Sequence, residues 1–174
     1  QIVIPTIKGL KSEQIPYLGF LFIGLMNING NPFVIEYNCR MGDPETEVVL
    51  PRIQNDLLEI FVKAASGRLN EIELKIDTQT AATIMLVSGG YPEDYKKGLE
   101  ISGLNNDYES IVYHAGTLLE NNIVKTNGGR VLAITSMANS VMEAFNKSNQ
   151  TASQINFSGK YHRVDLGKDL MKYF

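Results

Sequence analysis

The first third of the chain contains two apolar segments separated by a polar turn. Tyr17 to Ile28 is an almost continuous apolar run, the turn "NINGNP" follows, and "FVIEYNCR" ends at Arg40. An Asn-Gly pair between apolar runs of this kind is typical of a β-hairpin. We therefore expect two antiparallel strands here. A short helix over residues 2–14, ended by Pro16, is expected to precede them.

A helical pattern replaces the strand pattern after Arg40. Asp43 followed by Pro44 is a favourable start for a helix, and apolar residues then recur three or four positions apart. This apolar stripe consists of Leu50, Ile53, Leu57, Phe61 and Ala64. We expect one amphipathic helix from Asp43 to about Gly67, bent or restarted at Pro51, with its stripe packed in a core.

The chain beyond the polar stretch "NEIELKIDTQT" predicts a small β-rich unit with one helix. Ser140 and Glu143 form a capping box ahead of a helical stripe that ends near Ile155. A domain boundary near residue 75 follows, so residues 1–75 and 76–174 are expected to form separate domains. Strand-like segments separated by Gly, Asn and Pro turns cover residues 81–88, 98–104, 111–119 and 130–135.

The composition is that of an ordinary globular protein, with 44% hydrophobic and 20% charged residues. A formal net charge of -3 provides no basic surface for a nucleic acid backbone. The longest apolar run, Leu18 to Met26, is too short for a membrane-spanning helix, and a single cysteine excludes an internal disulfide. We therefore expect a cytoplasmic protein that binds neither nucleic acid nor membrane.

Polar side chains occupy one face of the second predicted strand. Because side chains alternate along a strand, Glu36, Asn38 and Arg40 share a face. Cys39 lies on the other face and is expected to be a small buried side chain rather than a nucleophile. A carboxylate and an amide two residues apart offer hard oxygen ligands for Mg²⁺, and a guanidinium can hold a phosphate with two parallel hydrogen bonds.

The same strand leads into "MGDPETE", a Gly-containing turn at a predicted helix N-terminus, where free backbone N–H groups favour an anion. Side chains suited to a metal ion and a phosphate, and backbone N–H groups suited to an anion, thus occur within one short run. This arrangement favours a nucleotide-phosphate site over the alternative of a polar strand face that is merely solvated.

These residues carry a family resemblance. The run "GFLFIGLMNINGNPFVIEYNCRMGDPETEVVLPRIQNDLLE" resembles the last part of the ATP-grasp domain of the phosphoribosylamine–glycine ligase family, also called glycinamide ribonucleotide synthetase. "GGYPEDYKKG", "YHAGT", "KTNGGRVLAITS" and "HRVDLG" resemble its C-terminal domain, in the same order. The resemblance implies an α+β fold. Residues 1–75 would be the closing half of an ATP-grasp subdomain, with antiparallel strands and a helix, and residues 76–174 a small β-rich C-terminal domain with one helix.

The resemblance also implies roles for individual residues. Glu36 and Asn38 would bind Mg²⁺ (or Mn²⁺) together with the ATP phosphates, and Arg40 would be the catalytic residue that faces the transferred phosphate. The implied enzyme is a ligase of purine biosynthesis, which joins glycine to 5-phosphoribosylamine through glycyl phosphate and converts ATP to ADP and phosphate. Four residues would shape the pocket for glycine and phosphoribosylamine: Gly42, Asp43, Pro44 and Glu45. Asp43 would serve equally well as a plain helix cap.

Two other functions stay open. One is a different ATP-grasp carboxylate–amine ligase or a carboxylase, although biotin carboxylase carries a further metal-binding glutamate where this chain has Gly24. The other is a non-catalytic binding or assembly module. The chain starts at Gln1 and its first methionine is Met26. We therefore expect it to be a fragment that is inactive alone and whose partner is the missing N-terminal portion of the same chain.

Overall fold

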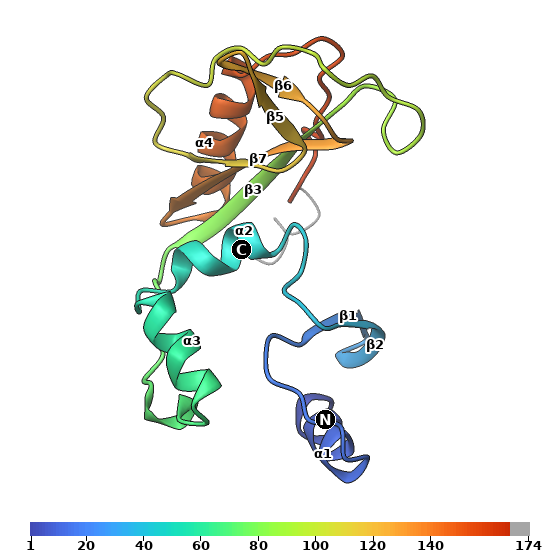
Figure 1. Ribbon diagram of the computed structural model, residues 1–174, viewed down its shortest axis with the longest axis vertical. Coiled ribbons are helices and arrows are strands. Elements are labelled where there is room, and N and C mark those ends of the chain that lie inside the picture. The colour runs from blue at the N-terminus through green and yellow to red at the C-terminus, as the bar shows by residue number, and fades with distance from the viewer. Residues whose placement is uncertain (168–174) are drawn as a thin grey trace. The chain divides into compact units, whose positions relative to one another are not determined.

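The computed structural model describes residues 1–167 of the chain. They divide into two compact units. Unit 1 comprises Gln1–Thr46 and Gln54–Lys75, and unit 2 comprises Glu47–Ile53 and the residues from Ile76 onward. Figure 1 labels the helices and strands of both units. Among residues 1–167, no helix has the length and apolar character needed to cross a bilayer.

Unit 1 begins with the predicted helix and hairpin, and the structure confirms both. Helix α1 spans Val3–Ser12, and strands β1 (Phe22–Ile28) and β2 (Asn31–Asn38) pair antiparallel. The turn residues Asn29 and Gly30 both have positive φ, 52° and 84°, as the tightest hairpin turns require.

The hairpin contains an irregularity that the sequence pattern did not predict. Gly24 pairs with Glu36, but the next residue, Leu25, pairs with Val34, so the register shifts between Gly24 and Leu25. Ile35 is therefore the extra residue of a β-bulge, which changes the direction of nearby side chains and increases the local twist.

The single helix predicted from Asp43 to Gly67 is wrong. The segment forms three short helices: α2 (Thr46–Val49), η1 (Leu50–Arg52) and α3 (Leu57–Ala65). Pro51 lies inside η1, and Ile53 is extended and pairs with Ile76. Asp56 then caps α3 by accepting hydrogen bonds from the backbone N–H groups of Leu58 at 2.8 Å and Glu59 at 3.3 Å. The restart expected near Pro51 therefore comes as separate helices.

Two further expectations for this segment are also corrected. The peptide bond between Asp43 and Pro44 is cis and lies in a turn ahead of α2, so Pro44 is not a first helical residue. Phe61 is 45% exposed and makes an edge-to-face contact with Phe20, with ring centroids 6.0 Å apart. The apolar stripe of α3 is therefore not part of a closed core within unit 1.

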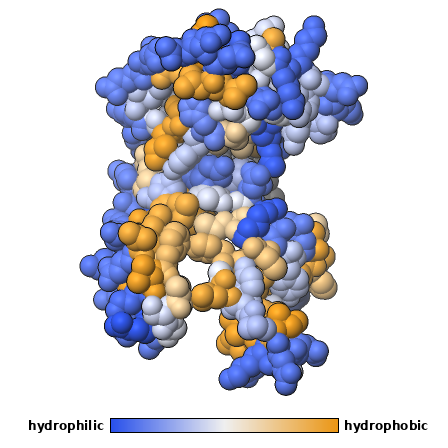
Figure 2. All heavy atoms as spheres, viewed as in Figure 1, coloured by the Kyte–Doolittle hydropathy of each residue, from blue (hydrophilic) through white to orange (hydrophobic). Residues whose placement is uncertain are grey.

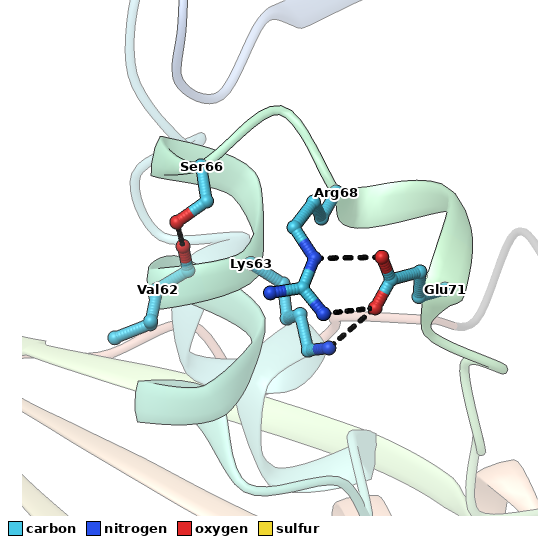
Figure 3. A network of polar contacts seen from close by, with 5 residues as sticks. All are labelled: Val62, Lys63, Ser66, Arg68 and Glu71. Atoms are coloured by element: carbon cyan, nitrogen blue, oxygen red, sulfur yellow. Dashed lines mark hydrogen bonds and ion pairs between the residues drawn. The ribbon is translucent and has the colours of Figure 1, made fainter.

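An ion cluster holds the end of α3 to the short helix η2 (Leu69–Glu71), as Figure 3 shows. Glu71 accepts hydrogen bonds from the Arg68 guanidinium at 2.6 and 2.8 Å and from Lys63 Nζ at 2.5 Å. These bonds, that from Arg68 first, lower the pKa of Glu71 from 4.5 to about 2. Ser66 closes the helix end by donating to the Val62 carbonyl oxygen at 2.8 Å.

Unit 2 is built on a three-stranded antiparallel sheet in the order β3-β7-β4, with a separate hairpin β5-β6. The bounds are Thr80–Val87 for β3, Ile111–His114 for β4, Thr117–Glu120 for β5, Ile123–Thr126 for β6 and Arg130–Ala138 for β7. Helix α4 spans Val141–Gln154, and Ser140 caps it by accepting a hydrogen bond from Glu143 N.

The predicted elements of unit 2 fare differently. Strands over 81–88 and 130–135 and the last helix are confirmed. The predicted strand 111–119 is two strands, β4 and β5, and the sequence pattern missed β6. Residues 98–104 do not form a strand. They make only two isolated bridges, each to a different segment: Glu100 pairs with Lys125 and Ser102 pairs with Asn156.

The two units differ sharply in burial. The core of unit 2 consists of Ile84, Leu86, Ile101, Val131, Leu132, Ile134, Ala152, Ile155 and Phe157. Unit 1 is described completely, and Gly42 is its only buried residue. Figure 2 shows hydrophobic side chains at the surface over α3, where Leu58 is 69% exposed. Unit 1 therefore has no closed hydrophobic core of its own.

Candidate active site

A pocket of about 300 Å³ in unit 1 collects the residues that the sequence singled out. Strands β1 and β2 and the turn that follows them supply its walls. Except for Pro44, every predicted site residue lines it: Glu36, Asn38, Arg40, Gly42, Asp43 and Glu45. The structure thus brings the polar strand face and the Gly-Asp-Pro turn together around one cavity.

Glu36 and Asn38 form the oxygen-rich part of the pocket. Asn38 Nδ2 donates a hydrogen bond to Glu36 Oε1 at 2.8 Å, which orients both side chains. Glu36 Oε2 and the Asn38 amide oxygen are not used in this bond and are oxygen ligands of the kind that a cation takes. Among residues 1–167, no group of three or more His, Cys, Asp and Glu is placed to hold a metal ion. The Glu36 carboxylate and the Asn38 amide oxygen are of the type that Mg²⁺ accepts beside phosphate and water oxygens.

Gly24 makes room for this pair. It lies opposite Glu36 in the hairpin, and a Cβ atom at this position would approach Glu36 Cγ to 3.1 Å. A larger side chain at position 24 would therefore press on Glu36.

Arg40 lies two residues after the end of β2 and provides the positive charge of the pocket. One of its N–H groups, on Nη1, donates to the Met41 carbonyl oxygen at 2.8 Å. Because a guanidinium has five N–H donors, this bond anchors the side chain and leaves donors for a phosphate or carboxylate.

Gly42 is buried where the turn packs most tightly. A Cβ atom on Gly42 would overlap the Glu45 carboxylate and lie 2.7 Å from the Phe22 ring. The Gly42 carbonyl oxygen accepts hydrogen bonds from both the backbone N–H, at 3.1 Å, and the hydroxyl of Thr46. Thr46 therefore ties this turn to the start of α2.

Sequence reasoning missed the apolar walls of the pocket, which include Phe22, Leu25 and Ile35. Strict alternation assigns Ile35 to the face opposite Glu36, but the β-bulge brings both residues to the same cavity. The expectation for Cys39 is also wrong, because the side chain is exposed. Cys39 lies just after the end of β2, in a unit whose only buried residue is Gly42.

The fold and this site define an ATP-grasp protein. The structure superposes with a TM-score of 0.61 on the biotin carboxylase subunit of pyruvate carboxylase, over 96% of this chain and 38% of that one; at 15% identity this is a likeness of fold. The family model for the phosphoribosylglycinamide synthetase C domain matches residues 81–169, and that for its ATP-grasp (A) domain matches residues 1–46. The chain therefore belongs to the phosphoribosylglycinamide synthetase family.

Individual relatives agree with this assignment, and the resemblance and the expected fold class are confirmed. The phosphoribosylamine–glycine ligase of Vibrio cholerae is 44% identical over 170 residues, which is 96% of this chain and 40% of the relative. The crystal structure of the phosphoribosylamine–glycine ligase from Thermotoga maritima has a TM-score of 0.81 at 32% identity, over 92% of this chain and 40% of that one. The chain thus spans about 40% of the length of the relatives it matches.

Proposed function

We propose that this chain is the C-terminal part of a phosphoribosylamine–glycine ligase of purine biosynthesis that acts in the cytoplasm. The reaction joins glycine to 5-phosphoribosylamine through glycyl phosphate and yields glycinamide ribonucleotide, ADP and phosphate. The observation that carries the proposal is the single pocket lined by Glu36, Asn38, Arg40 and the Gly42–Glu45 turn. It combines carboxylate and amide oxygens, a guanidinium group and a turn whose Gly42 carbonyl oxygen is held by Thr46.

In this proposal Glu36 and Asn38 hold the metal ion and through it the phosphates of ATP. Mg²⁺ or Mn²⁺ bound there would neutralise charge on the phosphate oxygens and fix the angle of attack. The 2.8 Å hydrogen bond between the two side chains supports this role, because it fixes their orientation before the ligand arrives.

Arg40 is the proposed catalytic residue. Phosphoryl transfer needs chiefly positioning and positive charge near the transferred group. A guanidinium anchored on the Met41 carbonyl meets both needs without reorganising during the reaction. Gly42, Asp43, Pro44 and Glu45 are proposed to bind glycine and the amine substrate, with the turn held in shape by Thr46.

The proposal assigns residues 1–75 to the end of the ATP-grasp domain and residues 76–174 to the C-terminal domain. Groups that bind adenine, and the rest of the ATP-grasp domain, would come from a preceding portion of a longer chain, the partner of this one. The lack of buried side chains in unit 1 supports this view, because its apolar surface needs a cover.

The proposal is tested by measuring ADP formation by the full-length ligase that carries this chain, with Mg-ATP, glycine and phosphoribosylamine, and with each omitted in turn. We expect turnover to require all three and to fall at least about 100-fold in Glu36→Gln. Glu13→Gln, an exposed glutamate after α1 that is not in the pocket, is the matched control.

Two outcomes would contradict the proposal. ADP release that depends on bicarbonate instead of glycine would indicate a carboxylase. Mg-ATP binding that is unchanged by Glu36→Gln would indicate a binding module with a solvated polar face.

A further inference from the structure

An aromatic side chain lies among the charged groups of the candidate active site. Phe22 is the first residue of β1, is partly buried, and lines the pocket together with Glu36, Asn38 and Arg40. Metal ligation and phosphate binding, as proposed above, use oxygen atoms and a guanidinium group, and neither requires an aromatic ring. The role of Phe22 is therefore to be sought at an uncharged part of a substrate.

The hairpin register places Phe22 on the same face as the polar pair. Phe22 pairs with Asn38, and two residues further along β1, Gly24 pairs with Glu36. Side chains of directly paired residues project to the same face of an antiparallel sheet. Gly24 contributes no side chain, so ahead of the β-bulge Phe22 is the residue of β1 that covers this face.

The Phe22 ring also packs on the turn that follows β2. A Cβ atom on Gly42 would lie 2.7 Å from Phe22 Cε2 and 2.9 Å from Glu45 Cβ. The ring and the Glu45 side chain therefore meet over Gly42 and leave no space for a single methyl group. Gly42 is buried, and its carbonyl oxygen accepts two hydrogen bonds from Thr46, so this arrangement exists before any substrate binds.

We propose that Phe22 restricts the acyl substrate to an amino acid without a side chain, an inference that rests on the function proposed above and deepens it. The carboxylate of the amino acid points towards Arg40 and its ammonium group towards the Glu45 carboxylate, each charge facing its opposite. The α-carbon then lies between these two groups, against the Phe22 ring. Glycine fits this space. A methyl group on the α-carbon meets the ring, and the crowding raises the barrier for alanine above that for glycine.

The test compares glycine with L-alanine and D-alanine as substrates of the full-length ligase that carries this chain. The rate of ADP formation that depends on the amino acid is measured with Mg-ATP and phosphoribosylamine in excess. We expect the ratio of kcat/KM for glycine to kcat/KM for alanine to fall about tenfold or more in Phe22→Ala, because one methyl group in a closed pocket is discriminated by about 10- to 200-fold. Phe22→Leu removes only part of the ring, and its ratio should fall by about threefold or more.

Phe33→Ala is the matched control. Phe33 lies on β2 of the same hairpin, is 54% exposed and does not line the pocket. Its ratio should stay within about twofold of that of the parent enzyme. The ratio separates selectivity from stability, because a variant that is merely less well folded loses activity with glycine and alanine alike. Phe22→Leu supplies the ratio if Phe22→Ala does not fold.

A wall on one side of the α-carbon also predicts a stereochemical result. L-alanine and D-alanine place the methyl group on opposite sides, so one of them should gain more from Phe22→Ala than the other. Equal gains for the two enantiomers would indicate that the whole turn has loosened and would contradict the role of Phe22.

Two further results would overturn the inference: an unchanged ratio in both Phe22 variants, or an equal fall of the ratio in Phe33→Ala. Failure of the ligase function itself is distinguishable from these. A parent enzyme that does not use glycine would contradict the proposed function and this inference together. Glycine-dependent turnover with an unchanged ratio in the Phe22 variants would leave the proposed function standing and remove only the role of Phe22.

Discussion

At the residue scale, the candidate active site depends on two glycines as much as on its charged groups. Gly24 leaves the space that Glu36 occupies, and Gly42 leaves the space in which Glu45 and the Phe22 ring meet. Neither glycine has a positive φ. Their role is therefore close approach of neighbouring side chains, and a Cβ atom would act by displacing those neighbours.

We predict that Gly42→Ala destabilises unit 1 by about 1–3 kcal/mol, because the added methyl group overlaps Glu45 and presses on Phe22. Because the hairpin is marginally stable in water, the change is read from the intensity of the β1 and β2 amide signals without denaturant. Gly9→Ala is the control: Gly9 lies within α1 and a Cβ there meets nothing within 4 Å. That variant should be neutral or gain up to about 1 kcal/mol. Equal losses in both variants would contradict the packing argument.

The ion cluster at Glu71 gives a pH dependence that can be followed at one carboxyl group. Its pKa is lowered from 4.5 to about 2 in the folded chain. The ionised form is thus favoured by folding, and the stabilisation is complete above about pH 4.5 and is lost as the pH falls towards 2. An NMR titration of the Glu71 side chain should show a midpoint near 2. In Arg68→Gln the midpoint should rise towards 4.5, since Arg68 is the largest cause. An unchanged midpoint in that variant would refute the assignment.

At the scale of single elements, α4 is joined to the sheet of unit 2 by hydroxyl groups as well as by apolar packing. Ser148 Oγ donates to the Ala82 carbonyl oxygen and contacts Ser136 Oγ, both at 2.9 Å. Ser110 bridges Ser136 at 2.7 Å and Thr151 at 2.8 Å. All four hydroxyl side chains are buried. The network fixes where along β3 and β7 the helix lies, which apolar contacts alone specify less sharply.

Ser148→Ala should therefore lower the free energy of unfolding of unit 2 by about 1–3 kcal/mol, because it leaves buried acceptors without their donor. The measurement is urea unfolding followed by β3 and β7 amide signals. Ser153→Ala on the same helix is the control, since Ser153 is exposed and bonds only to Gln150 within α4. We expect that control to stay within about 0.5 kcal/mol of the parent chain. A network that tolerates Ser148→Ala without loss would have no role in stability.

The start of α3 is a second element-scale prediction. Asp56→Ala removes the acceptor for the Leu58 and Glu59 N–H groups and should cost about 1 kcal/mol. Faster amide exchange at these two residues is the direct readout. Asp56→Asn keeps an acceptor oxygen and should restore most of the protection. Slow exchange in Asp56→Ala would mean that the Asp56 carboxylate does not cap α3.

At the scale of the whole molecule, the chain joins a unit with a closed core to one without. Backbone amides of Ile84, Leu86, Leu132 and Ile134, all with 0% exposed side chains, should be the slowest to exchange with solvent. Amides of β1 and β2 should exchange at least about 100-fold faster, because an isolated two-stranded hairpin is marginally stable in water. Hydrogen exchange on the 174-residue chain measures both. Equal protection of the hairpin and the β3-β7 sheet would contradict this division.

Part of the candidate site could be predicted from the sequence, because it depends on patterns among neighbouring residues. Glu36, Asn38 and Arg40 were found from strand alternation, and the Asn29–Gly30 turn from its residue types. Ile35 was misassigned, because a β-bulge depends on the partner strand and leaves no mark in the alternation. Cys39 was misassigned because burial depends on what covers a strand, which the strand's own sequence does not state.

The amino-acid sequence by itself determined the hairpin, the capped helix α4, the strands β3 and β7, and the residue types of the proposed metal and phosphate site. These features depend on periodicity and turn chemistry, which act over a few residues. The tertiary structure alone decided that Gly24 and Gly42 make room for carboxylates, that the predicted long helix divides, and that Gly89 lies against the backbone of Gly159. Those outcomes depend on which distant backbone segments come within van der Waals contact, and local sequence patterns do not encode that distance.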